Sequence, residues 1–206
     1  MARYIGPKNR LARREGEDLG LKTVGSSSHA SLLRRIKILP GQHGQKGRRK
    51  TSDYNKQLRE KQKVKRLYGL LEKQFKKYFD IASRDKSNTG EVLLTLLERR
   101  LDNVVYRLNL APTRAAARQY VSHGHILIDG KRVNIPSFLV DVGMTITPKQ
   151  KIIETPVVKK LLEEKNPNIP SWLERKGPVG KVIKMPQRED IVDNIDEQLI
   201  IEFYSR

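Results

Sequence analysis

Cysteine is absent from this chain of 206 residues. Its absence excludes disulfide bonds, a thiolate nucleophile and zinc sites built from cysteine. Histidine is another common zinc ligand, but His43 has no second ligand near it in the sequence. His123 and His125 lie two positions apart at the end of an expected helix, and that spacing cannot place both rings on one helical face. We therefore predict that the protein holds no structural metal and needs no cofactor.

Several other sequence features are missing as well. No run approaches the roughly 20 apolar residues of a membrane-spanning helix. The amino end lacks both a secretory pattern and a Ser-rich presequence, so we expect a cytoplasmic protein. There is no repeat and no Gly-Lys-Thr/Ser phosphate loop, and Glu98, Asp102 and Asp129 have ordinary explanations in helix pairing and turn formation. Without a catalytic constellation, we predict that the protein is not an enzyme.

Positive charge is in large excess: 42 lysines and arginines stand against 23 aspartates and glutamates, for a formal net charge of +19. A chain this basic repels itself unless a polyanion neutralises it, and nucleic acid is the polyanion that the composition indicates. An anionic membrane surface is the rival, although the basic stretches are not consistently amphipathic. Up to Gly90 there are 24 basic and 8 acidic residues, net +16, against 18 and 15, net +3, in the remainder. We therefore expect the first half of the chain to provide most of the electrostatic attraction to nucleic acid.

The most strongly patterned stretch begins with two helical segments. Apolar residues recur at three- and four-residue steps over residues 93–108, which predicts one helix that ends near Asn109. Pro112 disfavours continuation of that helix, and Thr113 is placed to cap a second helix that ends at Gly124.

A small sheet is expected directly after these helices. Residues 125–133 alternate around Asp129-Gly130, a pair that supplies the positive φ angles of a two-residue hairpin turn. A return strand over residues 144–147 completes the sheet.

The flanks are less regular. Residues 52–83 have helical spacing behind a Ser52 or Asp53 cap, and their aromatic stripe is expected to pack in a core rather than to stack on bases. Residues 1–50 are expected to form an extended or loop-rich arm against phosphates. A further helix is expected over residues 151–165, and residues 191–204 are expected to fold back onto the first half of the chain.

These patterns predict an α+β fold, with a mostly helical amino-terminal region and an inserted module of two helices and a small antiparallel sheet. The expected divisions are a basic loop-rich arm at 1–50, a helical region at 51–96, the module at 97–160 and a carboxy-terminal segment at 161–206 that packs back on the amino-terminal region.

Long motifs in this sequence resemble a known family. Four segments resemble the S-four RNA-binding module: Leu97–Arg107, Thr113-Arg114, Val121–Gly124 and Val133–Pro136. Five further segments resemble the bacterial-type S-four family of small ribosomal subunit proteins: Met1–Lys8, Arg13–Gly16, Pro40–Gly44, Gln57–Val64 and Glu202–Arg206. Some relatives carry a four-cysteine zinc site near the amino end, so this chain resembles a zinc-free variant whose amino-terminal region must order itself by packing and by contact with its partner.

The resemblance implies a structural constituent of the small ribosomal subunit that binds the five-prime domain of 16S rRNA, nucleates assembly of the subunit body and contributes to translational accuracy. It implies contacts with the fifth small-subunit protein and with mRNA where the message enters the subunit, and a monomer within the subunit. Two alternatives stay open: an RNA-modifying enzyme such as a pseudouridine synthase, or an RNA chaperone, each carrying the same module.

Side chains for RNA binding are expected from both halves. Arg114 and Arg118 share a helical face, and Lys131 and Arg132 follow the hairpin turn. The amino-terminal candidates are Arg3, Lys8, Arg10, Arg13, Arg14, Gln42, His43, Lys46, Arg48, Arg49, Lys50, Arg59, Lys61, Lys63 and Arg66. The module candidates are Arg99, Arg100, Arg107, Thr113, Arg114, Arg118, Gln119, Ser122, His123, Lys131, Arg132 and Asn134. The basic members are expected to neutralise phosphates, and the polar members to make further contacts.

Overall fold

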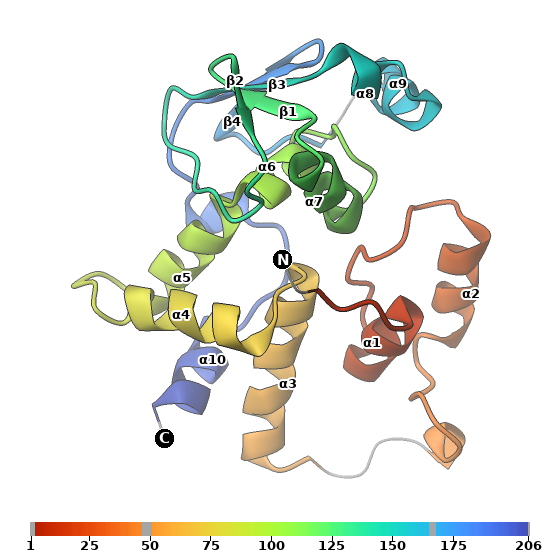
Figure 1. Ribbon diagram of the computed structural model, residues 1–206. Coiled ribbons are helices and arrows are strands. Elements are labelled where there is room, and N and C mark those ends of the chain that lie inside the picture. Colours follow the sequence, from red (N-terminus) through yellow and green to blue (C-terminus); the bar gives the residue numbers. More distant parts are fainter. Residues whose placement is uncertain (1–2, 47–50, 165–167, 206) are drawn as a thin grey trace. The chain divides into compact units, whose positions relative to one another are not determined.

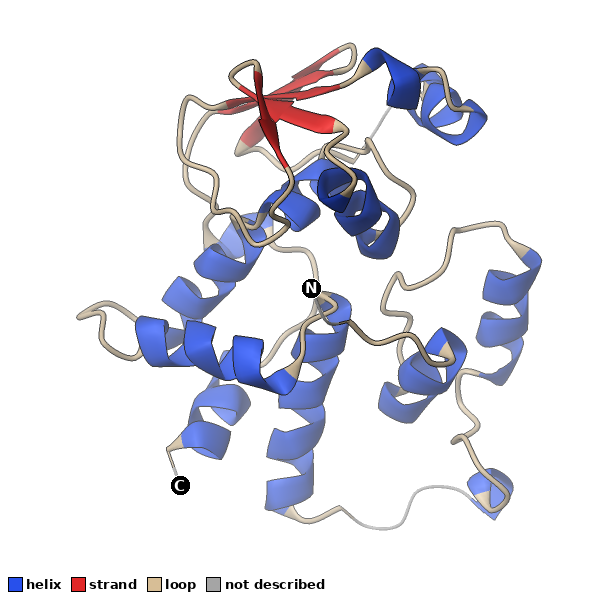
Figure 2. Cartoon of the chain, viewed as in Figure 1, coloured by secondary structure: helices blue, strands red, loops and turns tan. Residues whose placement is uncertain are grey.

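The computed structural model describes residues 3–46, 51–164 and 168–205 (Figure 1). The chain divides into two compact units, Met1–Gly90 with Asn194–Arg206, and Glu91–Asp193. Helices make up the described secondary structure of the first unit, whereas all five strands belong to the second (Figure 2). This confirms the α+β class and the mostly helical amino-terminal region.

The amino-terminal arm, expected to be extended or loop-rich, contains two short helices joined by loops. Helix α1 spans Lys8–Glu15 and α2 spans Ser27–Arg35, followed by the 3-10 turn η1 at Gly44–Lys46. Ser26 caps α2, because its side chain accepts a hydrogen bond from the His29 amide. Three buried apolar side chains lie at their packing surface, namely Ala12, Leu19 and Leu32.

Polar contacts link the segments of the arm. The Asn9 side-chain amide donates to the Ser28 carbonyl at 2.9 Å. His29 Nε2 lies 2.7 Å from the Asp18 carboxylate. Arg13 donates to the carbonyls of Ile38 and Leu39, at 2.9 and 3.1 Å.

The single helix predicted over residues 52–83 is two helices, α3 at Asp53–Leu67 and α4 at Glu72–Ala82. The break lies at Gly69, whose φ of 66° is left-handed and therefore incompatible with a continuing helix. The Ser52 cap is confirmed, since its side chain accepts from the Asn55 amide at 3.3 Å.

The carboxy-terminal helix α10, Glu197–Tyr204, packs against α3. The rings of Phe79 and Tyr204 are stacked with centroids 4.5 Å apart. Phe75 is fully buried, and Tyr68, Tyr78 and Phe79 are at most 8% exposed. The aromatic stripe is therefore core, as predicted.

In the second unit, the predicted helix over residues 93–108 is also divided, into α5 at Thr89–Glu98 and α6 at Leu101–Arg107. The cause is a distant segment that takes over the backbone bonds at the break. Leu101 donates its amide to the Phe138 carbonyl at 2.8 Å, and Val140 donates to Arg99 at 2.9 Å. Arg100 thus adopts an extended conformation as the N-cap of α6.

Helix α7, Arg114–Ser122, begins where expected, because the Thr113 hydroxyl accepts from the Ala116 amide at 3.2 Å. The predicted hairpin is confirmed as β1, Ile126–Ile128, and β2, Lys131–Val133. Its turn residues Asp129 and Gly130 have φ angles of 47° and 77°.

The sheet has five antiparallel strands in the order β2-β1-β3-β5-β4. It is larger than predicted, because the sequence indicated only the hairpin and one return strand. Strand β3, Thr145–Pro148, is that return strand. Strands β4, Leu173–Lys176, and β5, Val179–Val182, extend it. Gly180 lets β5 approach α6, because an added Cβ would lie 2.3 Å from Leu108 Cδ1.

Helical structure between β3 and β4 is interrupted. The predicted helix over residues 151–165 is divided into α8, Gln150–Ile153, and α9, Pro156–Glu163, because proline has no amide hydrogen to continue α8. A 3-10 turn, η2, follows the sheet at Arg188–Asp190.

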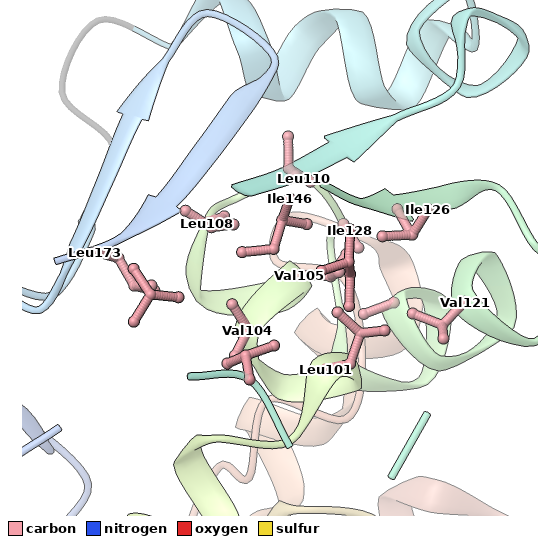
Figure 3. Packing of buried hydrophobic residues seen from close by; sticks show 14 of the residues in the cluster. Leu101, Val104, Val105, Leu108, Leu110, Val121, Ile126, Ile128, Ile146 and Leu173 are labelled. Atoms are coloured by element: carbon pink, nitrogen blue, oxygen red, sulfur yellow. The ribbon is translucent and has the colours of Figure 1, made fainter. Parts of the chain in front are cut away.

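The core of the second unit lies between helices α6 and α7 and the sheet (Figure 3). Leu101, Val104 and Val105 of α6 are fully buried and face Ile126 and Ile146 of the sheet. Truncating such a side chain to alanine costs about 2–5 kcal/mol, so this core fixes α7 and the hairpin to one frame.

Candidate nucleic-acid interface

The arginines predicted to bind RNA in the second unit fall into a buried set and an exposed set. Arg100 is the extreme buried case, with 0% exposure. Its guanidinium donates to both Asp102 carboxylate oxygens, Nε at 3.1 Å and Nη2 at 2.7 Å. A fully buried, ion-paired arginine cannot reach a ligand in solvent, so we take Arg100 out of the candidate interface.

Glu98 organises a polar network at the junction of α5, α6 and α7. This carboxylate is 1% exposed and accepts from Arg107 Nη2 at 2.7 Å and from Asn103 Nδ2 at 2.7 Å. Asn103 in turn accepts from Arg114 Nε at 2.8 Å. Asp193 accepts from Arg107 Nη2 at 2.8 Å and lies 3.4 Å from Arg114 Nη2. Arg107 and Arg114 are therefore held by internal partners.

Three further module candidates also make internal contacts. Arg118 is 7% exposed, and the Ser122 hydroxyl donates to its carbonyl at 2.8 Å. Arg99 bonds the Asp141 carboxylate and donates to the Val140 carbonyl at 3.1 Å. Thr113 is 7% exposed and caps α7. Arg99 thus ties the α5–α6 break to the segment at Val140 and Asp141, Thr113 begins α7, and Arg118 is buried on α7.

The exposed candidates lie at the end of α7 and along the hairpin. Gln119, Ser122 and His123 are exposed on and just after the last turn of α7. Lys131, Arg132 and Asn134 are exposed on and after β2. Two structural elements thus bring six predicted side chains to solvent within one unit.

In the first unit, the cations of α3 are mostly paired with carboxylates. Lys61 is 4% exposed, donates to Glu72 at 2.7 Å, and lies 4.4 Å from the Phe203 ring centroid. Lys63 is 8% exposed and lies 3.2 Å from both Glu17 and Glu60. The ammonium groups of these two lysines are buried and paired with carboxylates, so they are not presented to a phosphate in solvent, although their charge alone predicts phosphate binding.

Glu15 holds two other α3 cations. Its side chain is 2% exposed and pairs with Arg59 at 3.3 Å and with Arg66. The arginines themselves are 30% and 16% exposed, so part of each guanidinium faces solvent. Because Glu15 fixes both side chains from beneath, it orders a cationic pair at the surface.

The arm presents further cations. Arg3, Arg10 and Arg14 are exposed, and Lys8 is half-buried. Burial, and then repulsion from Lys22 and Arg3, lowers the pKa of the Lys8 ammonium. Arg13 is used internally, as its carbonyl bonds show.

The loop around η1 exposes the side chains of Gln42, His43 and Lys46. The backbone of Gly44 packs closely against the Leu39 carbonyl oxygen, from which an added Cβ would lie only 1.8 Å away. Only glycine fits at this position. Arg48, Arg49 and Lys50 lie outside the described residues.

Within the described ranges, no three His, Cys, Asp or Glu side chains are grouped to hold a metal ion. Over the same residues, no helix is long and apolar enough to cross a bilayer.

The sequence reasoning missed the acidic and amide residues that position the cations. Glu15, Glu72, Glu98, Asn103 and Asp193 each hold at least one predicted arginine or lysine. A local signal existed for Glu98, which lies five positions before Asn103 in the strongly patterned stretch. Asp193 is 86 positions from Arg107 and had no local signal.

Comparison with known proteins gives two family matches. Residues 3–98 match the family described as the ribosomal protein S4/S9 N-terminal domain, and residues 99–146 match the S4 domain. The chain is 52% identical to small ribosomal subunit protein uS4 of Halothermothrix orenii, 54% to that of Trichlorobacter lovleyi and 52% to that of Aquifex aeolicus. Each alignment covers 100% of both chains.

Proposed function

The chain belongs to the uS4 family of small ribosomal subunit proteins, and from this membership we propose how its surface serves the family's role. It is a structural, RNA-binding constituent of the small ribosomal subunit. We propose that it acts by binding alone and makes or breaks no covalent bond.

The distribution of the cations is the observation that carries the proposed mode of binding. Carboxylates pair with Arg59, Lys61, Lys63, Arg66, Arg100 and Arg107, whereas a second set of cations faces solvent in each unit. The pairs fix α3 and α6, and the core of the second unit fixes the hairpin that carries Lys131 and Arg132 to α6 and α7, so these two cations are presented on a rigid element. This arrangement suits a ligand that is itself folded and carries many phosphates.

We propose two contact surfaces. The first uses Arg3, Lys8, Arg10 and Arg14 of the arm, Gln42, His43 and Lys46 of the following loop, and Arg59 and Arg66 of α3. Arg48, Arg49 and Lys50, outside the described residues, are proposed as RNA contacts from the sequence. The second uses Gln119, Ser122 and His123 at the end of α7 with Lys131, Arg132 and Asn134 of the hairpin. Arg99, Arg107, Thr113, Arg114 and Arg118 would act mainly by positioning these elements, and Lys61 and Lys63 by ordering α3.

Phosphate neutralisation explains why the chain needs so many cations. Each contact releases counterions from the RNA, so affinity falls steeply with salt. Side chains cannot read the deep, narrow major groove of A-form RNA, and recognition therefore depends on the shape of the RNA and the spacing of its phosphates.

The family resemblance supports finer assignments. We propose that the RNA is the five-prime domain of 16S rRNA, that binding nucleates assembly of the subunit body, and that the bound protein contributes to translational accuracy. We also propose contacts with the fifth small-subunit protein and with mRNA where it enters the subunit, made by a single copy of the chain.

Co-sedimentation tests the structural role. Tagged protein expressed at its native level is expected to stay with small subunits, at one copy each, through a moderate-salt wash. A chain that acted as an RNA-modifying enzyme or an RNA chaperone would be scarce in the washed subunits, and that result would overturn the proposal.

A further inference from the structure

Two histidines, two lysines and an arginine meet at one corner of the second unit. His123 is the C-cap of α7, and His125 precedes β1. Arg132 belongs to β2, Lys149 is the N-cap of α8, and Lys151 lies within α8. The proximity of the five residues is therefore a product of the fold and not only of sequence spacing.

Backbone and ring contacts hold this corner together. The centroids of the two imidazole rings lie 5.9 Å apart. The Lys149 amide donates to the His125 carbonyl at 2.8 Å, which ties the start of α8 to the start of β1. The His125 amide donates to the Tyr120 carbonyl at 3.0 Å, which ties β1 to α7. His123 is exposed and His125 is partly exposed, so solvent reaches the histidine pair.

Gly124 allows the arginine to join the pair. It has a φ of 68°, and an added Cβ would lie 2.1 Å from Arg132 Nε. The Arg132 guanidinium occupies that space, with Nη2 3.5 Å from the His123 carbonyl oxygen. A side chain at position 124 would displace the guanidinium from the histidines.

The corner is rich in positive charge. Partial burial lowers the pKa of His125, and His123, Lys151, Lys149 and Arg132 lower it further by repulsion. The other charged side chains on the surrounding elements have partners within the fold or lie further along them. Those of α7 are Arg114 and Arg118, which are 8% and 7% exposed, and Lys131 on β2 is exposed.

The nearby carboxylates are engaged with their own elements. Glu154, at the end of α8, accepts from the Gln150 side chain at 3.1 Å. Asp129, in the hairpin turn, accepts from the Thr145 amide at 2.9 Å. Neither is among the groups that act on His125. An anion from outside the chain would thus meet three cations, Arg132, Lys149 and Lys151, beside two imidazoles, and the cations oppose protonation of His125 in its absence.

We propose that this corner binds an RNA backbone phosphate and that His125 takes up a proton as the phosphate arrives. The proposal rests on the proposed RNA-binding function and adds His125, Lys149 and Lys151 to its contacts. RNA is the ligand favoured over an acidic protein surface, because the corner adjoins the exposed cations of the hairpin and the polar end of α7.

The sign of the pH dependence follows from the charges. In the free protein, burial and the neighbouring cations disfavour the protonated form of His125. A bound phosphate favours that form, which raises the pKa of His125 in the complex above its pKa in the free protein. The extra affinity is therefore present at a pH below the free-state pKa and is lost as the pH rises through the pKa of the complex. Each linked proton changes affinity by at most about tenfold per pH unit.

The test measures affinity for a small-subunit rRNA fragment at constant salt between about pH 6 and pH 8, the range in which histidine titrates. The native chain is compared with a His123→Asn, His125→Asn double variant and with Val157→Thr, an exposed change on α9 that touches none of the five residues of the corner. Native protein and the Val157 variant are expected to lose about tenfold to a hundredfold in affinity across the range. The double variant is expected to bind with a nearly flat pH profile.

A second measurement does not depend on variants. The imidazole signals of the native chain are followed by NMR against pH, with and without the RNA fragment. The proposal expects the His125 signal, one of four histidine signals, to titrate at higher pH when RNA is bound. Unchanged midpoints would overturn it, as would a double variant that keeps the native pH slope.

Two further outcomes separate the proposals. RNA binding that does not vary with pH overturns the proton-linked site and leaves the proposed function intact, whereas no RNA binding at any pH overturns both. If polyglutamate, and not RNA, bound with the histidine-dependent slope, the corner would serve an acidic protein surface and the proposal would be wrong.

Discussion

The Arg107 guanidinium donates to both carboxylate oxygens of Glu98, with Nη2 2.7 Å from Oε1 and Nε 3.1 Å from Oε2. Because Glu98 is 1% exposed, this pair lies within the fold rather than on its surface. It joins α5 to α6 across the break at Arg99 and Arg100. The pair therefore supports the frame on which the exposed RNA contacts are carried.

Replacing Arg107 by leucine is expected to destabilise the second unit. The change leaves the Glu98 carboxylate buried without its guanidinium, and breaking a buried pair in this way costs about 3–5 kcal/mol. Urea denaturation of the full chain measures the loss. Arg132→Gln is the matched control, because an exposed cation usually changes stability by less than about 0.5 kcal/mol. Equal stability of the two variants would contradict a structural role for Arg107.

Exposed and buried cations are expected to affect RNA binding differently. Replacing Lys131 and Arg132 by glutamine should leave the melting temperature unchanged. The same change should weaken RNA binding and reduce the salt slope of log affinity by about one for each lost phosphate contact. Filter binding across a salt series measures both effects.

The contrasting variant is Arg114→Gln with Arg118→Gln. Both side chains are largely buried, so we expect a lower melting temperature. RNA binding should weaken because α7 is no longer held in place. If this variant instead kept the native melting temperature and flattened the salt slope, Arg114 and Arg118 would themselves contact phosphate.

Glu15→Gln is expected to reduce RNA affinity although it removes a negative charge. The Glu15 carboxylate holds Arg59 and Arg66 in place, and a neutral amide holds them less firmly. If the less ordered guanidinium groups reduce the binding free energy by about 1.4 kcal/mol, binding is about tenfold weaker. Glu17→Gln removes the same charge from a half-exposed position beside Lys63 and serves as the control. Tighter binding by the Glu15 variant would show that the carboxylate opposes RNA rather than positioning its ligands.

The contact between α10 and α4 is expected to loosen in acid. Burial opposes ionisation of Glu72, but hydrogen bonds from Lys61, Lys65 and Tyr204 lower its pKa from 4.5 to about 2. When folding lowers the pKa of a carboxyl group, the ionised group stabilises the folded state at a pH above its unfolded-state pKa. That stability is lost as the pH falls through the folded-state pKa. The window is therefore from pH 4.5 down to about 2.

Near-ultraviolet circular dichroism monitors this contact, because Tyr204 stacks on Phe79. The native chain should lose part of its tyrosine signal within the window. Glu72→Gln should show the weaker signal already at neutral pH and change less on acidification. Identical acid profiles for the two proteins would argue against a role for Glu72 in holding α10.

Features set by adjacent residues were predictable from the sequence. The Thr113 cap, the Asp129-Gly130 hairpin and the Ser52 cap each depend on hydrogen bonds or φ preferences within a few positions. Gly69 is a local signal for the break between α3 and α4, although the helical spacing of apolar residues continues on both sides of it.

Features set by distant residues were not predictable. The break at Arg99 and Arg100 arises from bonds to Phe138 and Val140, about forty positions away. The same limit applies to the site. Sequence identified which residues carry positive charge, but the burial of Arg100 and the pairing of Arg107 with Asp193 depend on the folded chain.

The most direct test of the central claim is a salt titration of the purified full chain binding to the five-prime domain of small-subunit rRNA. If exposed cations from both units neutralise about six to ten phosphates, affinity should fall on the order of a thousandfold or more between about 50 and 200 mM salt. Affinity that stayed constant over this range, or an absence of binding at the lowest salt concentration, would contradict the account.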